Sequence, residues 1–276
     1  MKFPWHHSAM GFRLATWNIN SVRLRIGLVE KLLKEQQPDI LCLQETKCPQ
    51  GQFPSKTLHD LGYHYIAEYG QKGYHGVAIV SRVPFVDQHS RDFCKKGDTR
   101  HISARFAGNL PFTLHNFYVP AGGDEPDPKI NEKFAHKLSF LEEMEDWSKK
   151  HAAPNGGEAI MVGDLNVSPL EHDVWNHKQL LKVVCHTPAE TERFAKIMKA
   201  GAWVDVMRNF VPPEEKLYTW WSYRSADWET ANKGRRLDHV LTSPGLAASA
   251  RKMSVIKETR GWTQSSDHVP VIIDFS

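Results

Sequence analysis

The chain has 276 residues, of which 35 are basic and 32 acidic, so its net charge at neutral pH is only +3. That length suffices for a large α/β domain with a substantial core. The near balance of charge excludes a strongly basic nucleic-acid binder, so any polyanionic partner must be met by local basic clusters. The four cysteines form no CxxC pair, which argues against a zinc site or a disulfide scaffold and favours a reducing, cytoplasmic compartment.

The ends of the chain carry no targeting or membrane signal. The opening MKFPWHHSAM lacks the apolar stretch of a signal peptide, and no window reaches the apolar length of a membrane span. We expect residues 1–11 to form a loose extension, with Met10 as an alternative start. No low-complexity linker interrupts residues 12–276, which we therefore expect to form a single domain.

Apolar periodicity alternates between strand-like and helix-like segments along that domain. The expected strands are, in chain order, FRLATWN, DILCLQE, GVAIVS, HISARF, FTLHNFYV, AIMVGDLN, LDHVL, KMSVI and VPVIIDF. The expected helices are one marked by Val22, Ile26, Val29 and Leu33 and ending before Pro38, a long one marked by Ile130, Phe134, Leu138 and Leu141, and one that opens with the capping box Thr187 to Glu190 and ends by Gly201. Neighbouring strands and helical crossovers both occur, which predicts mixed sheets.

Oxygen-rich side chains recur where the expected strands end. The four pairs are Asn18 and Asn20, Gln44 and Glu45, Asn116 and Tyr118, and Asp164 and Asn166. Each side chain alone is more often a turn residue, a cap or a solvated acid. Four strands that end in the same chemistry instead favour a ligand site at one edge of the sheets.

The composition of these strand ends predicts a hard metal ion. Carboxylate and amide ligands without thiols suit Mg²⁺, or Mn²⁺ as its substitute, and such ions typically complete their shell with substrate phosphates. A phosphate-ester substrate is therefore expected. The closing SSDHVPVIIDFS places Asp267 and His268 before the last strand, where a turn is the simplest interpretation, but an imidazole there could also hold a phosphoryl oxygen.

Six motifs occur in a familiar order: TWNIN, LQETK, NFYVPAGG, MVGDLN, RRLDHVL and SSDHVP. From Phe12 to Phe275 the chain resembles the exonuclease III family of abasic-site (AP) endonucleases, its bacterial branch especially. The closing SDH also occurs in pancreatic-type deoxyribonucleases and inositol polyphosphate phosphatases. The resemblance implies one catalytic domain, a four-layer α/β sandwich of two mixed β-sheets packed face to face with flanking helices. It also implies a monomeric, Mg²⁺-dependent enzyme that cleaves duplex DNA 5′ of abasic sites and removes nucleotides or blocking groups from 3′ ends.

The resemblance also implies roles for the polar residues. The implied metal ligands are Asn18, Glu45 and Asp267, with Glu45 the principal one. The implied catalytic residues are Tyr118, Asp164, Asn166, Asp238 and His268. Asp164 would deprotonate water, and Asp238 would fix the tautomer of His268. Asn166, His268 and Tyr118 would bind the scissile phosphate.

Assignment of DNA contacts is less direct, because a solvated charge is the simpler interpretation of most basic residues. The expected contacts are Lys72, Tyr74, Arg100, Trp220, Trp221, Arg235, Arg236 and Leu237. Trp220 and Trp221 match an aromatic wall that packs against an extrahelical sugar. Arg235 departs from the pattern, because the animal enzymes carry another aromatic there.

Two other functions remain open from the sequence. A phosphatase acting on inositol or lipid phosphates would share the closing SDH, although LQETK and YGQKGYHG speak against it. A catalytically dead DNA-binding scaffold is disfavoured, because it would have no need of Glu45 and Asp164 together.

Overall fold

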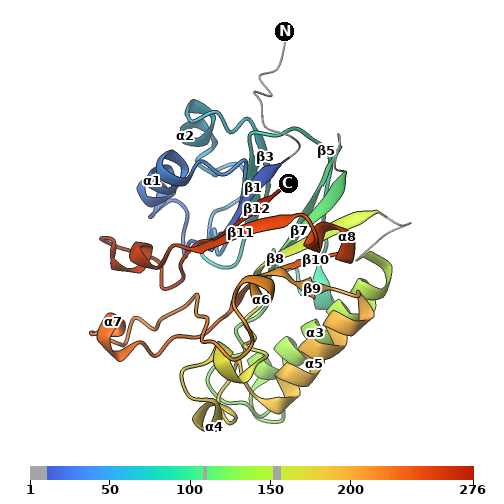
Figure 1. Ribbon diagram of the computed structural model, residues 1–276, viewed down its shortest axis with the longest axis vertical. Coiled ribbons are helices and arrows are strands. Elements are labelled where there is room, and N and C mark those ends of the chain that lie inside the picture. Colours follow the sequence, from blue (N-terminus) through green and yellow to red (C-terminus); the bar gives the residue numbers. More distant parts are fainter. Residues whose placement is uncertain (1–10, 108–110, 152–156) are drawn as a thin grey trace.

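Two six-stranded mixed sheets form the centre of the computed structural model, which describes residues 11–107, 111–151 and 157–276 (Figure 1). The first sheet runs β11 (Ala250–Val255), β12 (Val271–Phe275), β1 (Phe12–Asn18), β2 (Ile40–Gln44), β4 (Val77–Ser81), β3 (Tyr65–Tyr69). The second runs β5 (Phe85–Ser90), β6 (His101–Phe106), β7 (Phe112–Tyr118), β8 (Glu158–Asp164), β10 (Asp238–Thr242), β9 (Val204–Asp205). The loose extension expected at residues 1–11, and with it Met10, lies outside the described residues except for Gly11.

Helices cover the outer faces of both sheets. The α-helices are α1 (Ile26–Gln36), α2 (Ser55–Asp60), α3 (Glu132–His151), α4 (His177–Leu180), α5 (Pro188–Ala200), α6 (Val206–Phe210), α7 (Trp228–Ala231) and α8 (Pro244–Ala247). In the described part of the chain, 3-10 helices span Phe93–Lys95, Glu171–Asp173 and Lys257–Gly261. In Figure 1, α1 and α2 lie outside the first sheet, and α3 and α5 run side by side outside the second.

The central strands are buried on both faces, which makes their sequences almost continuously apolar. In β1, Leu14 belongs to the core between the sheets, whereas Ala15 faces the core under α1. In β8, Val162 faces the sheet interface and Met161 the core under α3 and α5. This arrangement confirms the predicted four-layer α/β sandwich.

The capping box was predicted correctly, and α5 begins at Pro188 and ends before Gly201. Glu190 Oε2 accepts a hydrogen bond from the backbone N–H of Thr187 at 3.1 Å. The expected helix through Ile130 was placed too early. Asn131 Oδ1 accepts hydrogen bonds from the first turn of α3, so the helix begins after it and Ile130 is left 74% exposed.

Strand pairing brings the oxygen-rich ends together. The parallel pairs β1–β2 and β7–β8 align Asn18 with Gln44 and Tyr118 with Asp164. Asp238 begins β10 directly opposite Asp164. The strand β12 lies antiparallel beside β1, so the residues that precede β12 reach the same edge.

None of the helices in the described parts of the chain has the length and apolar character needed to cross a bilayer. All four cysteines are free thiols, and three of them are buried.

Candidate active site

His268 lies between two carboxylates at this edge. Its Nδ1 is 2.8 Å from Asp238 Oδ2, and its Nε2 is 3.5 Å from Asp164 Oδ2. Thr219 Oγ1 donates a further hydrogen bond to Asp238 Oδ2 at 2.6 Å. Burial would lower the pKa of His268, but the two carboxylates outweigh it and raise the pKa to about 10. The ring is therefore an imidazolium at neutral pH, held in one orientation by Asp238.

Asp164 is buried, and each of its carboxylate oxygens accepts a hydrogen bond. Asn18 Nδ2 donates to its Oδ2 at 2.8 Å, and the backbone N–H of Asn166 donates to its Oδ1 at 3.0 Å. Burial raises the pKa of Asp164 to about 7, although the positive charge of His268 opposes this shift. A carboxylate with a pKa near neutrality is suited to accept a proton from water.

Glu45 forms the anionic part of the site. Its Oε1 accepts a hydrogen bond from Asn18 Nδ2 at 2.9 Å, and its Oε2 lies 2.9 Å from Lys47 Nζ. Burial would raise the pKa of Glu45, but the charge of Lys47 and the bond from Asn18 hold it below its ordinary value. Glu45 has φ 49° and Asn166 has φ 51°, so two site residues adopt a left-handed backbone that side chains disfavour.

Asp267 and Trp220 are joined beside this group. Asp267 Oδ2 accepts a hydrogen bond from Trp220 Nε1 at 2.9 Å, and its Oδ1 accepts one from Asn20 Nδ2 at 3.3 Å. Asn20 in turn donates its backbone N–H to Asn18 Oδ1 at 3.1 Å. The three expected metal ligands thus belong to one hydrogen-bonded group, with Asp267 linked through Asn20.

Tyr118 and Arg100 form a stacked pair. The guanidinium of Arg100 lies 4.9 Å above the ring of Tyr118, and burial raises the pKa of the phenol, which keeps it a neutral donor. Arg100 is only 7% exposed and pairs with Asp98 at 2.9 Å. We therefore assign Arg100 to the support of Tyr118 rather than to the expected DNA contact.

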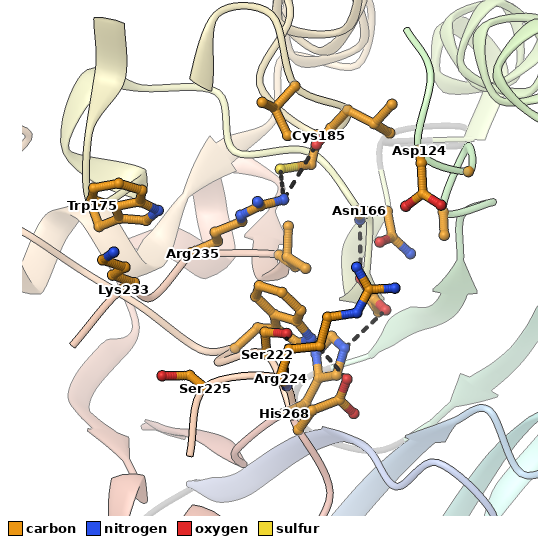
Figure 2. Close-up of a pocket in the computed structure, with 18 of the residues that line it drawn as sticks. Asp124, Asn166, Trp175, Cys185, Ser222, Arg224, Ser225, Lys233, Arg235 and His268 are labelled. Carbon is orange, nitrogen blue, oxygen red and sulfur yellow. Dashed lines mark hydrogen bonds and ion pairs between the residues drawn. The ribbon is translucent and has the colours of Figure 1, made fainter. Parts of the chain in front are cut away.

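A cavity of about 720 Å³ opens over these residues. Of the residues expected from the sequence, those that line it are Glu45, Tyr118, Asp164, Asn166, Trp220, Arg235, Leu237, Asp267 and His268. In Figure 2, Arg235 lies next to Cys185 and Lys233, and His268 lies lower in the view. The cavity therefore joins a catalytic end, made from strand ends, to a wall made from loops.

Sequence reasoning missed part of that wall. Trp175, Val184, Cys185 and Arg224 also line the cavity. Trp175 lies under Lys233, a member of the basic cluster around the expected Arg235, at 4.8 Å from its ring (Figure 2). These loops carry no motif. They reach the site only because Val174 and Trp220 both bridge to Arg235.

Arg236 has a different role from the expected one. It is fully buried, and its guanidinium binds both oxygens of Asp173, at 2.7 and 2.9 Å, and Asp205 at 2.7 Å. Adjacent residues of an extended chain point to opposite sides, so Arg235 reaches the cavity and Arg236 the core. A DNA contact by Arg236 conflicts with this burial, and we assign it a structural role.

The same alternation separates Trp220 from Trp221. Trp221 is 3% exposed, donates Nε1 to Asn232 Oδ1 at 3.1 Å and packs edge-on against Trp228. It is absent from the residues that line the cavity, whereas Trp220 is among them. The expected two-residue aromatic wall is therefore corrected to Trp220 alone, with Trp175 as a second ring.

Lys72 and Tyr74 lie on an exposed loop away from these contacts, and Tyr74 is 69% exposed. Their expected role at DNA stays a prediction.

The two-sheet fold and the acid–imidazole–acid row at its edge define the class of enzymes that hydrolyse phosphate esters on an α/β sandwich. A family model described as "Endonuclease/Exonuclease/phosphatase family" matches residues 15–268. The Exodeoxyribonuclease III of Haemophilus influenzae is 29% identical, over 95% of this chain and 99% of its own length.

Two solved structures are similar over nearly the whole chain. An AP endonuclease from Archaeoglobus fulgidus has a TM-score of 0.87 and 34% identity, over 96% of this chain and 99% of its own. A 3′ phosphatase from Neisseria, bound to a product DNA hairpin, has a TM-score of 0.83 and 32% identity, with the same coverage. The chain belongs to the endonuclease/exonuclease/phosphatase family, in its exonuclease III and AP endonuclease branch, which confirms the resemblance.

Proposed function

We propose that the protein is a divalent-metal-dependent DNA-repair phosphodiesterase of the exodeoxyribonuclease III and AP endonuclease type. It would cleave 5′ of abasic sites and remove nucleotides or blocking groups from 3′ ends of duplex DNA. The observation that carries the proposal is the row Asp238–His268–Asp164, which lies beside Glu45 and faces a cavity walled by Trp220. The full-length similarity to nucleases and to a DNA-bound phosphatase supports it.

The donor set fits a hard cation. Glu45 is an ionised carboxylate that lines the cavity, and it contacts the Asn18 amide. We propose Glu45 as the main ligand of Mg²⁺, or Mn²⁺ in its place, with Asn18 and Asp267 contributing. Such an ion would screen the phosphate charge and stabilise the leaving oxygen.

A second cluster with ligand spacing is a weaker metal site. Asp164, Asp238 and His268 each offer a ligand atom, and these atoms lie within 4.8 Å of one another. A metal-bound imidazole must be neutral, however, and the raised pKa of His268 keeps both ring nitrogens protonated at neutral pH. We therefore assign these three residues to proton transfer and phosphate binding.

The remaining roles follow from the hydrogen bonds. Asp164 would accept the proton of the attacking water, because its raised pKa lies near neutrality. The cation of His268 would stabilise the negative charge that develops on the phosphoryl oxygens. Asn166 Nδ2 donates one hydrogen to Val119 O at 2.9 Å, which leaves its second hydrogen for the phosphate, and Tyr118 would donate from another side.

The wall residues would favour a substrate nucleotide that lacks its base. A nucleotide without a base costs little to swing out of the duplex. Trp220 and Leu237 would pack against its deoxyribose, while Lys72 and Tyr74 would contact the duplex outside the cavity. All these residues come from one chain, so a monomer suffices.

One set of assays tests the proposal. The measurement is kcat/KM on matched duplexes with an abasic analogue or a normal nucleotide at one position, on a recessed 3′ end, and on a soluble inositol phosphate, each with Mg²⁺ and with EDTA. We expect cleavage at the abasic site and at the 3′ end that EDTA abolishes. Turnover of the inositol ester with both DNA substrates intact would refute the proposal, and cleavage unaffected by EDTA would refute its metal requirement.

A further inference from the structure

Arg235 lies in the cavity wall with its guanidinium fixed in place. Its guanidinium carbon is 5.1 Å from the centre of the Trp220 ring. Its Nη1 donates to Val184 O at 3.3 Å and to Cys185 Sγ at 3.2 Å. Trp220, Val184 and Cys185 all line the same cavity, so the guanidinium is held against the wall by residues on several sides (Figure 2).

The charge of Arg235 is left without a counterion. Within the described residues it forms no ion pair, and neither do Arg224 and Lys233, the other two cations of this wall. Arg235 Nε is buried and has no hydrogen-bond partner. An unpaired buried donor costs free energy, which a ligand with acceptor oxygens would recover.

The acids that line the cavity are concentrated elsewhere. Three of the four, Glu45, Asp164 and Asp267, belong to the catalytic end, where each accepts hydrogen bonds from neighbouring side chains. The fourth, Asp124, lies beside Asn166 and apart from Arg235 in Figure 2. The cavity is thus polarised, with carboxylates near the reacting phosphate and unpaired cations on the wall.

We propose that this wall is an anion subsite, in which Arg235, supported by Lys233, binds a phosphate or carboxylate on the DNA fragment that leaves on the 3′ side of the cut. A planar guanidinium matches such groups with two parallel hydrogen bonds. Lys233, stacked over Trp175, adds a second positive charge. The inference rests on the proposed function and narrows its substrates to those whose leaving fragment is anionic.

Two sources can supply that anion. At an internal abasic site it is the phosphate that joins the abasic residue to the next nucleotide. At a damaged 3′ end it is a terminal carboxylate, such as that of a glycolate ester. Both place a negative group one residue beyond the reacting phosphate.

The test pairs each charged substrate with a neutral partner. The first pair is a duplex with an internal abasic analogue followed by an ordinary phosphate or by a methylphosphonate. The second pair is a 3′ end that carries a phosphoglycolate or its uncharged amide. For each, kcat/KM is measured with the wild type, Arg235→Leu, Arg235→Lys and the control Arg251→Leu, which removes an exposed charge on β11.

We expect the wild type to favour the charged member of at least one pair by about tenfold, the value of one charge-assisted hydrogen bond. Arg235→Leu should abolish that preference, Arg235→Lys should retain part of it, and Arg251→Leu should leave it unchanged. The pair that shows the preference identifies the source of the anion.

Equal losses on charged and neutral members in Arg235→Leu would overturn the subsite, because Arg235 would then only shape the wall. A wild type that cleaves the DNA substrates but prefers the charged member of neither pair would also overturn the subsite and leave the proposed function intact. A wild type that cleaves none of the four DNA substrates would overturn both.

Discussion

The two ends of the cavity are built in opposite ways. At the catalytic end the side chains come from the ends of β1, β2, β7, β8 and β10, and Asp164 and His268 are buried with partners on each side. The wall comes from loops, and its cations Arg235 and Lys233 have no acid partner among the described residues. The proposed catalytic residues are thus held by the sheets, while the loops proposed to select the substrate are free to differ.

The sharpest test of the catalytic end is Asp164→Asn. The amide has nearly the same shape but cannot accept a proton from water, so kcat on an abasic duplex should fall about 10³-fold, with a much smaller change in KM. Single-turnover kinetics measure both, and thermal unfolding checks the fold. A rate above a tenth of wild type would make Asp164 a spectator.

The variants Arg236→Met and Arg235→Leu should differ in how far each lowers the free energy of unfolding. Arg236→Met leaves Asp205 without its ion-pair partner and Asp173 with Arg208 alone, so the free energy of unfolding should fall by about 3–5 kcal/mol. Arg235→Leu breaks no ion pair within the described residues and should cost less than about 1 kcal/mol. Urea unfolding measures both, and similar losses would contradict the division between wall and core.

Lys137 and Glu190 form a buried ion pair that joins the two ends. Lys137 Nζ donates to Asn166 O at 2.6 Å, and Glu190 accepts from the Cys185 backbone N–H at 2.8 Å. The double variant Lys137→Met with Glu190→Gln leaves no charge uncompensated. It should lower kcat per folded molecule about tenfold, because Asn166 loses a support.

The control for this pair is Lys149→Met on the same helix, where Lys149 pairs with Asp146 at the surface. It should leave kcat unchanged. Full activity of the buried double variant would show that the pair contributes only to stability.

Asp238→Asn should change the pH dependence of kcat. His268 has a pKa of about 10, above its ordinary 6.5, so its proton and the stability that it brings are fully present below pH 6.5 and are lost as pH rises through 10. Without the charge of Asp238, the alkaline limb of kcat should move down by about 1–3 pH units. The alkaline limb is followed by measuring kcat from about pH 6 to about pH 10. If the limb lies at the same pH in the variant as in the wild type, Asp238 has only a structural role.

Trp175→Ala should have the smallest effect and should act on binding. The loss of one aromatic contact is worth about 1 kcal/mol, which corresponds to a KM about fivefold higher, with a smaller change in kcat. Steady-state kinetics on the abasic duplex measure it. A larger loss in kcat than in KM would place Trp175 with the catalytic end.

Much of the fold could be predicted from the sequence, because it depends on local patterns. Apolar runs identified the central strands, and the capping box at Thr187 located the start of α5. The start of α3 was missed, because a single asparagine cap, Asn131, stops the helix short of Ile130. The cap determines only where the helix begins, whereas the apolar pattern continues through Ile130. The pattern therefore predicted a helix that is too long at its start.

By itself, the sequence determined which oxygen-rich residues end the strands, because their types and order are local, and it thereby predicted Asn18, Glu45 and Asp164 for one site, to which the family resemblance added His268. Only the tertiary structure decided which of two adjacent residues enters the cavity. Trp220 and Arg235 line it while Trp221 and Arg236 are buried, since the outcome depends on the register of each segment against distant partners. The same long-range pairing brought Trp175 to the wall, which no spacing along the chain could reveal.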